Sequence, residues 1–172
     1  MTQLIPRQAV PALTVDTLNN GTWTLAEQTP DNFTLIAFYR GYHCPKCRGQ
    51  LRDLEANLEK FSEIGIDVIA ISSNPAELAT QTQFEWGLTN LNIGYSLTIE
   101  QARAWGLYVS NAIKASEPDQ FSEPAIYIVR PDGTLYASIV YTMPFARTKA
   151  AELLGGLKWI IENDYPARGE VI

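Results

Sequence analysis

Two nearly continuous apolar runs, residues 32–39 and 66–71, are the strongest pattern in this sequence. Neither run alternates between apolar and polar positions, so each predicts a strand that is covered on both faces of a sheet. Between them, apolar residues recur at spacings of three and four, which predicts an amphipathic helix over residues 45–61. A strand, a helix and a second strand within about 40 residues are typical of a right-handed βαβ unit.

The remaining segments surround this unit with hairpins and helices. Residues 10–27 predict a small hairpin that turns at Asn19-Asn20-Gly21. The other elements that we expect are a helix over 75–88 with Asn74 as its N-cap, strands at 93–97, 125–129 and 134–141, and helices at 100–107 and 146–162. The polar segment 108–123 predicts a long loop, and its part 116–122 is a candidate flap over a substrate.

This order of elements favours an α/β protein with a thioredoxin-like fold. Its central mixed sheet is flanked by helices and extended by the N-terminal β-hairpin. The chain has 172 residues, of which 46% are hydrophobic and 19% charged, and we expect one domain over 1–172. The sequence contains no internal repeat and no interdomain linker.

Charge and hydropathy exclude several classes of partner. A net charge of −6 argues against a nucleic-acid surface. No apolar run reaches the roughly 18 residues that a membrane span needs. The first seven residues are too polar for a secretory signal, so we expect a cytoplasmic protein. Thiols stay reduced in that compartment, where a cysteine pair is more often catalytic or metal-binding than structural.

The two cysteines of the chain, Cys44 and Cys47, form a Cys-Pro-Lys-Cys motif directly after the first buried strand. This spacing suits thiol–disulfide exchange, because one thiol can attack and the other can resolve the mixed disulfide. Pro45 suits the first helical position, which puts Cys44 at the N-cap. Unpaired N–H groups and the helix dipole would there lower the pKa of Cys44, in known cases to about 3.5–7.5.

The neighbourhood of the pair is basic. No Asp or Glu occurs between Asp31 and Asp53, whereas the stretch holds several cationic residues and the only histidine: Arg40, His43, Lys46, Arg48 and Arg52. These residues either favour a thiolate or form an ordinary solvated helix face. His43 is a candidate base or an electrostatic neighbour.

The apolar stripe of the helix distinguishes the two thiols. Extended backwards, it passes through Cys47 and then reaches Cys44 at the helix start. We therefore expect Cys47 to be buried and Cys44 to lie at the exposed end. On this argument Cys44 attacks and Cys47 resolves.

Other interpretations of the pair remain. Structural zinc needs four ligands, so only a site shared between subunits would suffice. Covalent haem attachment needs a histidine where Arg48 stands. A structural pair, or an inert pair in a binding module, is the non-enzymatic alternative. We expect no metal and no other cofactor.

The segment Phe38-Tyr39-Arg40-Gly41-Tyr42-His43-Cys44-Pro45-Lys46-Cys47-Arg48-Gly49-Gln50-Leu51 resembles the active-site segment of the alkyl hydroperoxide reductase/thiol-specific antioxidant (AhpC/TSA) family. It is most similar to peroxiredoxin-like members that carry Cys-x-x-Cys. Residues 11–13 with the Asn20-Gly21 turn, and residues 123–133, resemble further parts of the family. The resemblance implies a thioredoxin fold, redox chemistry on thiols, disulfides or peroxides, and antioxidant activity.

The resemblance also implies roles for single residues. Peroxiredoxins typically carry Thr-x-x-Cys, so Cys47 stands at the peroxidatic position and Cys44 at that of the threonine. Pro124 stands where such enzymes supply an arginine, which Arg40 or Arg48 would replace. Thioredoxin-like reductases have a cis-proline at the place of Pro124, where it would expose backbone for an extended substrate.

Two functional hypotheses follow. The first is a thiol–disulfide oxidoreductase in which Cys44 attacks and Cys47 resolves. The alternative is a thiol peroxidase with Cys47 peroxidatic and Cys44 resolving. Either enzyme needs a disulfide or peroxide substrate and a thiol electron donor, such as a thioredoxin-type protein or glutathione. A homodimer is the assembly that we consider, with the tail 165–172 as a candidate contact with the neighbouring subunit.

Overall fold

The structure, a computed structural model, describes residues 3–171. Met1 and Thr2 of the polar N-terminal segment, and Ile172 at the end of the tail considered above, lie outside the described residues. No helix within the described range is long and apolar enough to cross a membrane.

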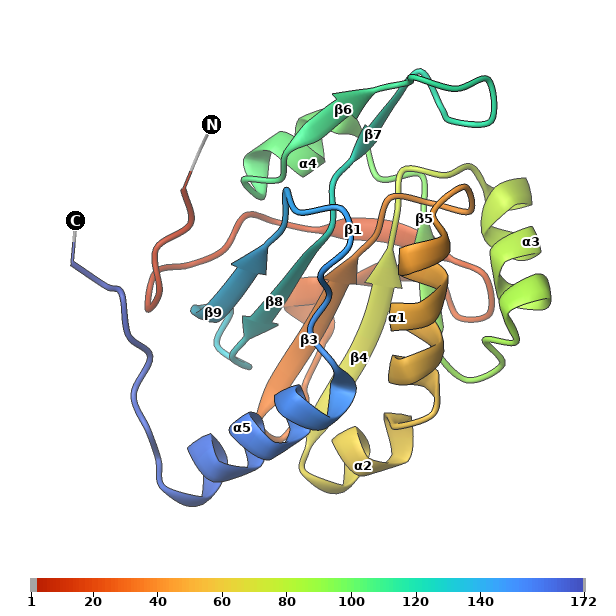
Figure 1. Cartoon of the computed structure of the whole chain (residues 1–172). Coiled ribbons are helices and arrows are strands. Elements are labelled where there is room, and N and C mark those ends of the chain that lie inside the picture. Colours follow the sequence, from red (N-terminus) through yellow and green to blue (C-terminus); the bar gives the residue numbers. More distant parts are fainter. Residues whose placement is uncertain (1–2, 172) are drawn as a thin grey trace.

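A central sheet of seven strands, in the order β2-β1-β5-β4-β3-β8-β9, organises the fold (Figure 1). Its strands are β1 (Thr14–Thr17), β2 (Gly21–Thr24), β3 (Phe33–Phe38), β4 (Ile66–Ile71), β5 (Asn92–Tyr95), β8 (Ala125–Val129) and β9 (Leu135–Val140). The central strand β3 pairs in parallel with β4 and antiparallel with β8. The predicted mixed sheet and N-terminal hairpin are therefore confirmed.

Helices cover both faces of this sheet (Figure 1). The helices are α1 (Pro45–Glu55), α2 (Leu58–Glu63), α3 (Ala76–Trp86), α4 (Ile99–Ala104) and α5 (Ala150–Glu162), with a short 3-10 helix η1 (Leu25–Glu27). Leu35 and Ala37 of β3 pack with α1, α3 and α5, whereas Ile36 and Phe38 pack with α4 and the N-terminal hairpin. The continuous apolar run of β3 thus reflects burial on both faces.

Two helix predictions need correction. The helix expected over 45–61 is two helices, because the chain turns at Ala56 and Asn57, where the Asn57 side chain donates to the carbonyl of Asp53 at 2.8 Å. An Asn side chain that bonds to nearby backbone in this way competes with the helical ladder. Helix α3 begins at Ala76 with Pro75 as its N-cap, so Asn74 is not the cap that the sequence predicted.

The segment 108–123 is also not the plain loop that its polarity suggested. It forms a second, two-stranded sheet from β6 (Val109–Asn111) and β7 (Gln120–Ser122), with residues 112–119 between them. We call residues 109–122 the ribbon. The last helix starts at Ala150 rather than Ala146, and residues 142–149 form a loop in front of it that we call the β9–α5 loop.

Candidate active site

The loop between β3 and α1 owes its shape to a glycine and an asparagine. Gly41 has a φ of +132°, and a Cβ added there would lie 2.6 Å from Oδ1 of Asn74. The same Oδ1 accepts a hydrogen bond from the main-chain N–H of Tyr42 at 2.7 Å. Asn74 is fully buried, so this contact ties the loop to the end of β4. A glycine is required because other residues rarely adopt this φ and have no room here.

Cys44 and Cys47 occupy the first turn of α1 as the spacing predicted. Cys44 is the N-cap residue and Pro45 follows in the first helical turn. The Sγ of Cys44 accepts a hydrogen bond from the main-chain N–H of Cys47 at 3.3 Å. Cys47 is 0% and Cys44 is 3% exposed. The expected order of burial is right, but the prediction of an exposed Cys44 is wrong, because Cys44 belongs to the buried hydrophobic cluster that also contains Cys47 and Tyr141.

The two thiols differ in acidity. Hydrogen bonds from the thiol and main chain of Cys47, together with the charges of Arg40 and Arg147, lower the pKa of Cys44 to about 6 against the opposing effect of burial. Burial raises the pKa of Cys47 well above its ordinary value, and the hydrogen bond between the Cys47 thiol and the Cys44 sulfur raises it further. At neutral pH this arrangement favours a thiolate on Cys44 and a protonated thiol on Cys47.

Arg40 is held beside this pair by the ribbon and by Glu123, the residue that follows it. Its guanidinium makes ion pairs with Glu123 (Nε–Oε2, 3.5 Å) and Glu117 (Nη2–Oε1, 3.8 Å). The centre of the guanidinium also lies 4.8 Å from the ring centroid of Phe121 in β7. The ribbon, which contains the predicted flap 116–122, therefore packs against the active-site loop.

His43 packs edge-on against the ring of Phe121, with 4.7 Å between the ring centroids. Burial and the charge of Arg40 lower the pKa of His43, so the imidazole is neutral at pH 7. Its Nε2 is buried and has no hydrogen-bond partner among the described residues. A neutral imidazole in this position can accept or relay a proton.

Two of the predicted site residues, Arg48 and Pro124, lie differently from expectation. Arg48 is exposed, and its charge acts on Tyr42 and Glu85 rather than on the cysteines. The expected cis-proline is also wrong, because no peptide bond between residues 3 and 171 is cis. The Pro124 carbonyl already accepts from the N–H of Tyr141 at 3.0 Å, so it is not free to pair with a substrate strand.

Arg147 is a site residue that the sequence did not reveal. It lies in the β9–α5 loop. Its positive charge contributes to the lowered pKa of Cys44 and opposes the rise in the pKa of Cys47. Its Nη1 donates to the carbonyls of Met143 at 2.9 Å and Ala146 at 2.7 Å. No local pattern marks this arginine, because it is about 100 residues away from the cysteines in the sequence and acts on them only in the folded chain. Figure 1 shows the segment between β9 and α5 running across the face of the sheet that α1 covers.

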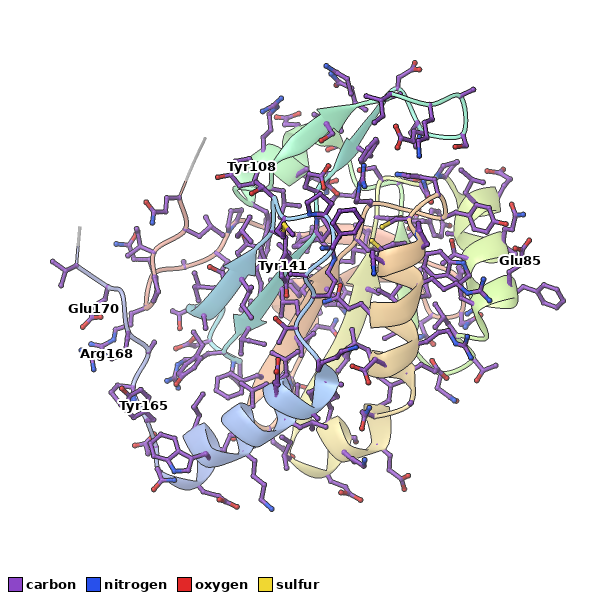
Figure 2. The ribbon with its side chains drawn as sticks, in the orientation of Figure 1. Glu85, Tyr108, Tyr141, Tyr165, Arg168 and Glu170 are labelled. Carbon is purple, nitrogen blue, oxygen red and sulfur yellow. The ribbon has the colours of Figure 1, made fainter. Side chains whose placement is uncertain are left out.

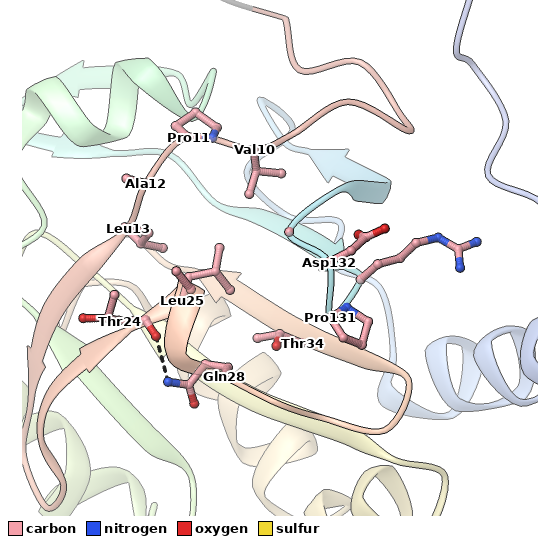
Figure 3. Close-up of a pocket in the computed structure, with 13 residues that line it drawn as sticks. Val10, Pro11, Ala12, Leu13, Thr24, Leu25, Gln28, Thr34, Pro131 and Asp132 are labelled. Carbon is pink, nitrogen blue, oxygen red and sulfur yellow. Dashed lines mark hydrogen bonds between the residues drawn. The ribbon is translucent and has the colours of Figure 1, made fainter.

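A cavity of about 230 Å³ lies away from the cysteines, between the N-terminal segment, η1 and the turn after β8 (Figure 3). Thr34 at the amino end of β3 lines it, whereas Cys44 follows the carboxyl end of the same strand. The cavity and the candidate active site are therefore at opposite ends of the sheet. Within residues 3–171, no three His, Cys, Asp or Glu side chains gather as a group that could hold a metal ion.

Comparison with protein families identifies the chain. Residues 6–138 match the AhpC/TSA family, and this segment contains the whole cysteine motif. The chain belongs to the AhpC/TSA family. It is accordingly an oxidoreductase that acts on peroxides or on thiols and disulfides.

Solved structures of peroxiredoxins have the same fold as this AhpC/TSA member. A mutant of peroxiredoxin 6 from Arenicola marina is 17% identical over 95% of this chain and 76% of its own, with a TM-score of 0.77. AhpC from Enterococcus faecalis is 17% identical over 94% and 97% of the two chains, with a TM-score of 0.74. Peroxidoxin BcpB from Mycobacterium tuberculosis is 14% identical over 92% and 99%, also at 0.74. No curated protein matches the sequence.

Proposed function

We propose that this AhpC/TSA member is a thiol–disulfide oxidoreductase in which Cys44 attacks and Cys47 resolves. The observation that supports this most is the unequal acidity of the two thiols. The pKa of Cys44 is lowered to about 6, whereas burial raises that of Cys47. The attacking species in thiol–disulfide exchange is the thiolate, so Cys44 is the better nucleophile at neutral pH.

The proposed reaction needs only the two cysteines and the substrate disulfide. The Cys44 thiolate attacks one sulfur of a disulfide, forms a mixed disulfide and releases the other sulfur as a thiolate. Cys47 then gives up its proton, attacks the Cys44 sulfur and releases the second substrate thiol. The products are a Cys44–Cys47 disulfide, one substrate thiol and one substrate thiolate. The released thiol carries the proton that Cys47 gave up. An external thiol donor, such as a thioredoxin-type protein or glutathione, then reduces the pair.

A thiol peroxidase with Cys47 peroxidatic is the second candidate, and one contact favours it. The main-chain N–H of Arg40 donates to the Cys47 sulfur and would stabilise a thiolate there. A hydroperoxide would convert this thiolate to a sulfenic acid and leave as an alcohol or water. Cys44 would then condense with the sulfenic acid and release water. The raised pKa of Cys47 disfavours this assignment.

Serine variants of each cysteine test the assignment. With a chromogenic aromatic disulfide, Cys47→Ser should accumulate a mixed disulfide on Cys44 that mass spectrometry detects, because the resolving thiol is missing. Cys44→Ser should react slowly and trap little. If Cys44→Ser retains the wild-type rate of reaction, the proposed roles are wrong.

A second experiment, with hydrogen peroxide, distinguishes the thiol–disulfide oxidoreductase from the thiol peroxidase. Reduced protein is mixed with hydrogen peroxide in a stopped-flow instrument, and sulfenic acid is trapped with dimedone. Under our proposal, Cys47 in the Cys44→Ser variant reacts no faster than an ordinary buried thiol. Rapid labelling of Cys47 would instead support the peroxidase.

A further inference from the structure

Arg147 presents one edge of its guanidinium without a protein partner. Nε and Nη2 are both buried and have no hydrogen-bond partner among the described residues, whereas Nη1 is bonded to two carbonyls. Within residues 3–171, Arg147 also makes no ion pair with a carboxylate. Arg40 differs in that its charge is paired with Glu117 and Glu123, although its Nε also has no hydrogen-bond partner among the described residues. Buried polar groups normally have a partner, so a ligand group that displaces the atoms covering this edge would satisfy two unpaired donors.

Contacts with Tyr141 and Thr148 hold the Arg147 side chain in place. The guanidinium lies over the ring of Tyr141, 5.2 Å from its centroid. The hydroxyl of Tyr141 bonds to that of Thr148 at 2.6 Å and accepts from the Thr148 N–H at 3.1 Å. These contacts join Tyr141, which directly precedes the β9–α5 loop, to Thr148 near the end of the loop, on either side of Arg147.

The same contacts place the loop beside the cysteines. Tyr141 belongs to the buried cluster that contains Cys44 and Cys47. Figure 2 shows Tyr141 in the segment after β9, on the side of the sheet that α1 covers. Lys46, between the two cysteines, lies with its Nζ 5.8 Å from the ring centroid of Phe145 in this loop. The Arg147 charge accordingly acts on both sulfur atoms.

The chemistry of the free edge indicates what it binds. Nε–H and Nη2–H lie side by side in one plane, and this fork matches the two oxygens of a carboxylate. A carboxylate would also compensate the unpaired positive charge. Because Cys44 is only 3% exposed, a small molecule reaches it more readily than a folded protein does.

We propose that the Nε/Nη2 edge of Arg147 binds a carboxylate of a low-molecular-weight disulfide whose sulfur reacts with Cys44. This inference rests on the proposed function and adds the class of substrate. Arg147 is then the residue that selects anionic small disulfides over neutral or cationic ones.

Alkylation tests the subsite without any turnover. Iodoacetate and iodoacetamide attack the same thiolate, but only iodoacetate has a carboxylate. We expect the ratio of their rate constants at Cys44 to be at least about fivefold higher in the wild type than in Arg147→Lys, since a lysine keeps the charge but lacks the fork. Arg147→Gln should show a similarly low ratio. The ratio is insensitive to a change in the Cys44 pKa, which affects both reagents equally.

Arg48→Gln is the matched control, because it removes an exposed positive charge on α1 and should leave the ratio unchanged. An equal ratio in the wild type and both Arg147 variants would overturn the proposal. The same ratio would stay informative if the protein proved inactive on disulfides, so failure of the subsite and failure of the proposed function are distinguishable.

Model disulfides then test selectivity. We expect the wild type to prefer the dianion dithiodipropionate over neutral hydroxyethyl disulfide, and to turn over dicationic cystamine slowest. Arg147→Lys should lose mainly the preference for the dianion, whereas equal losses on all three substrates would contradict the proposal. A loss confined to oxidation by hydrogen peroxide would assign the fork to a peroxide and would also overturn it.

Discussion

The main-chain N–H of Cys47 donates a hydrogen bond to the Sγ of Cys44, with 3.3 Å between nitrogen and sulfur. The bond comes from the first turn of α1, where main-chain N–H groups have no partner within the helix. It therefore stabilises negative charge on Cys44 and leaves Cys47 as the protonated thiol.

The alkylation rate of Cys44 should depend on pH with a midpoint of about 6. The thiolate is the reactive form, so the rate should rise as pH increases through this midpoint and level off near neutrality. Iodoacetamide labelling of the reduced protein, with mass spectrometry to assign the site, measures the profile. Arg40→Gln should move the midpoint upward because it removes a charge that lowers the pKa. A wild-type midpoint near that of a free thiol would refute the assignment.

Glu117→Gln should move the same midpoint to lower pH. The carboxylate of Glu117 lies 3.8 Å from Arg40 and partly compensates the guanidinium charge. With a neutral amide in its place, Arg40 would favour the Cys44 thiolate more strongly. Glu100→Gln on the exposed side of α4 is the control and should leave the profile unchanged. An upward shift for Glu117→Gln would mean that the ion pair does not act through Arg40.

Gly41→Ala should destabilise the protein by about 1–3 kcal/mol, because it adds a clash with Asn74 to a positive φ. Urea unfolding followed by far-UV circular dichroism gives the free energy of unfolding. Gly49→Ala is the matched substitution, since Gly49 lies in α1 and a Cβ there meets nothing within 4 Å. It should stabilise by roughly 0.5–1 kcal/mol. Equal effects of the two substitutions would contradict the role of the Gly41–Asn74 contact.

Glu55 should contribute a pH-dependent part of the stability. Its carboxylate accepts from the main-chain N–H groups of Asn90 at 3.0 Å and Leu91 at 2.7 Å. Burial alone would raise the pKa of Glu55, but these bonds outweigh it and lower the pKa. The stabilisation is therefore present above the ordinary pKa of a glutamate and is lost as pH falls through the lowered value.

The test is urea unfolding of the wild type and Glu55→Gln across the acidic range. At neutral pH the variant should be less stable by about 1 kcal/mol, a modest value because the carboxylate is partly exposed. The difference should shrink as pH falls. A constant difference at every pH would show that the charge of Glu55 is not what matters.

Local patterns in the sequence predicted the elements that depend on local residues. The apolar runs at β3 and β4 identified the buried strands, and Pro45 identified the start of α1. Errors arose where a side chain bonds outside the regular pattern. Asn57 ends α1 by bonding to the Asp53 carbonyl, and Asn74 turns to Tyr42 instead of capping α3.

Residue types and their spacing were enough to predict the redox-active cysteine pair, its place between a strand and a helix, and the order in which the two thiols are buried. These features depend on residue types within a few turns of chain, where periodicity and capping preferences are visible. The burial of Cys44, the pairing of Arg40 with Glu117 and Glu123, and the effect of the Arg147 charge on Cys44 became visible only in the folded chain. The ribbon and the β9–α5 loop come from parts of the chain that are distant from the cysteine motif. Contacts between distant segments leave no periodic signal in either one.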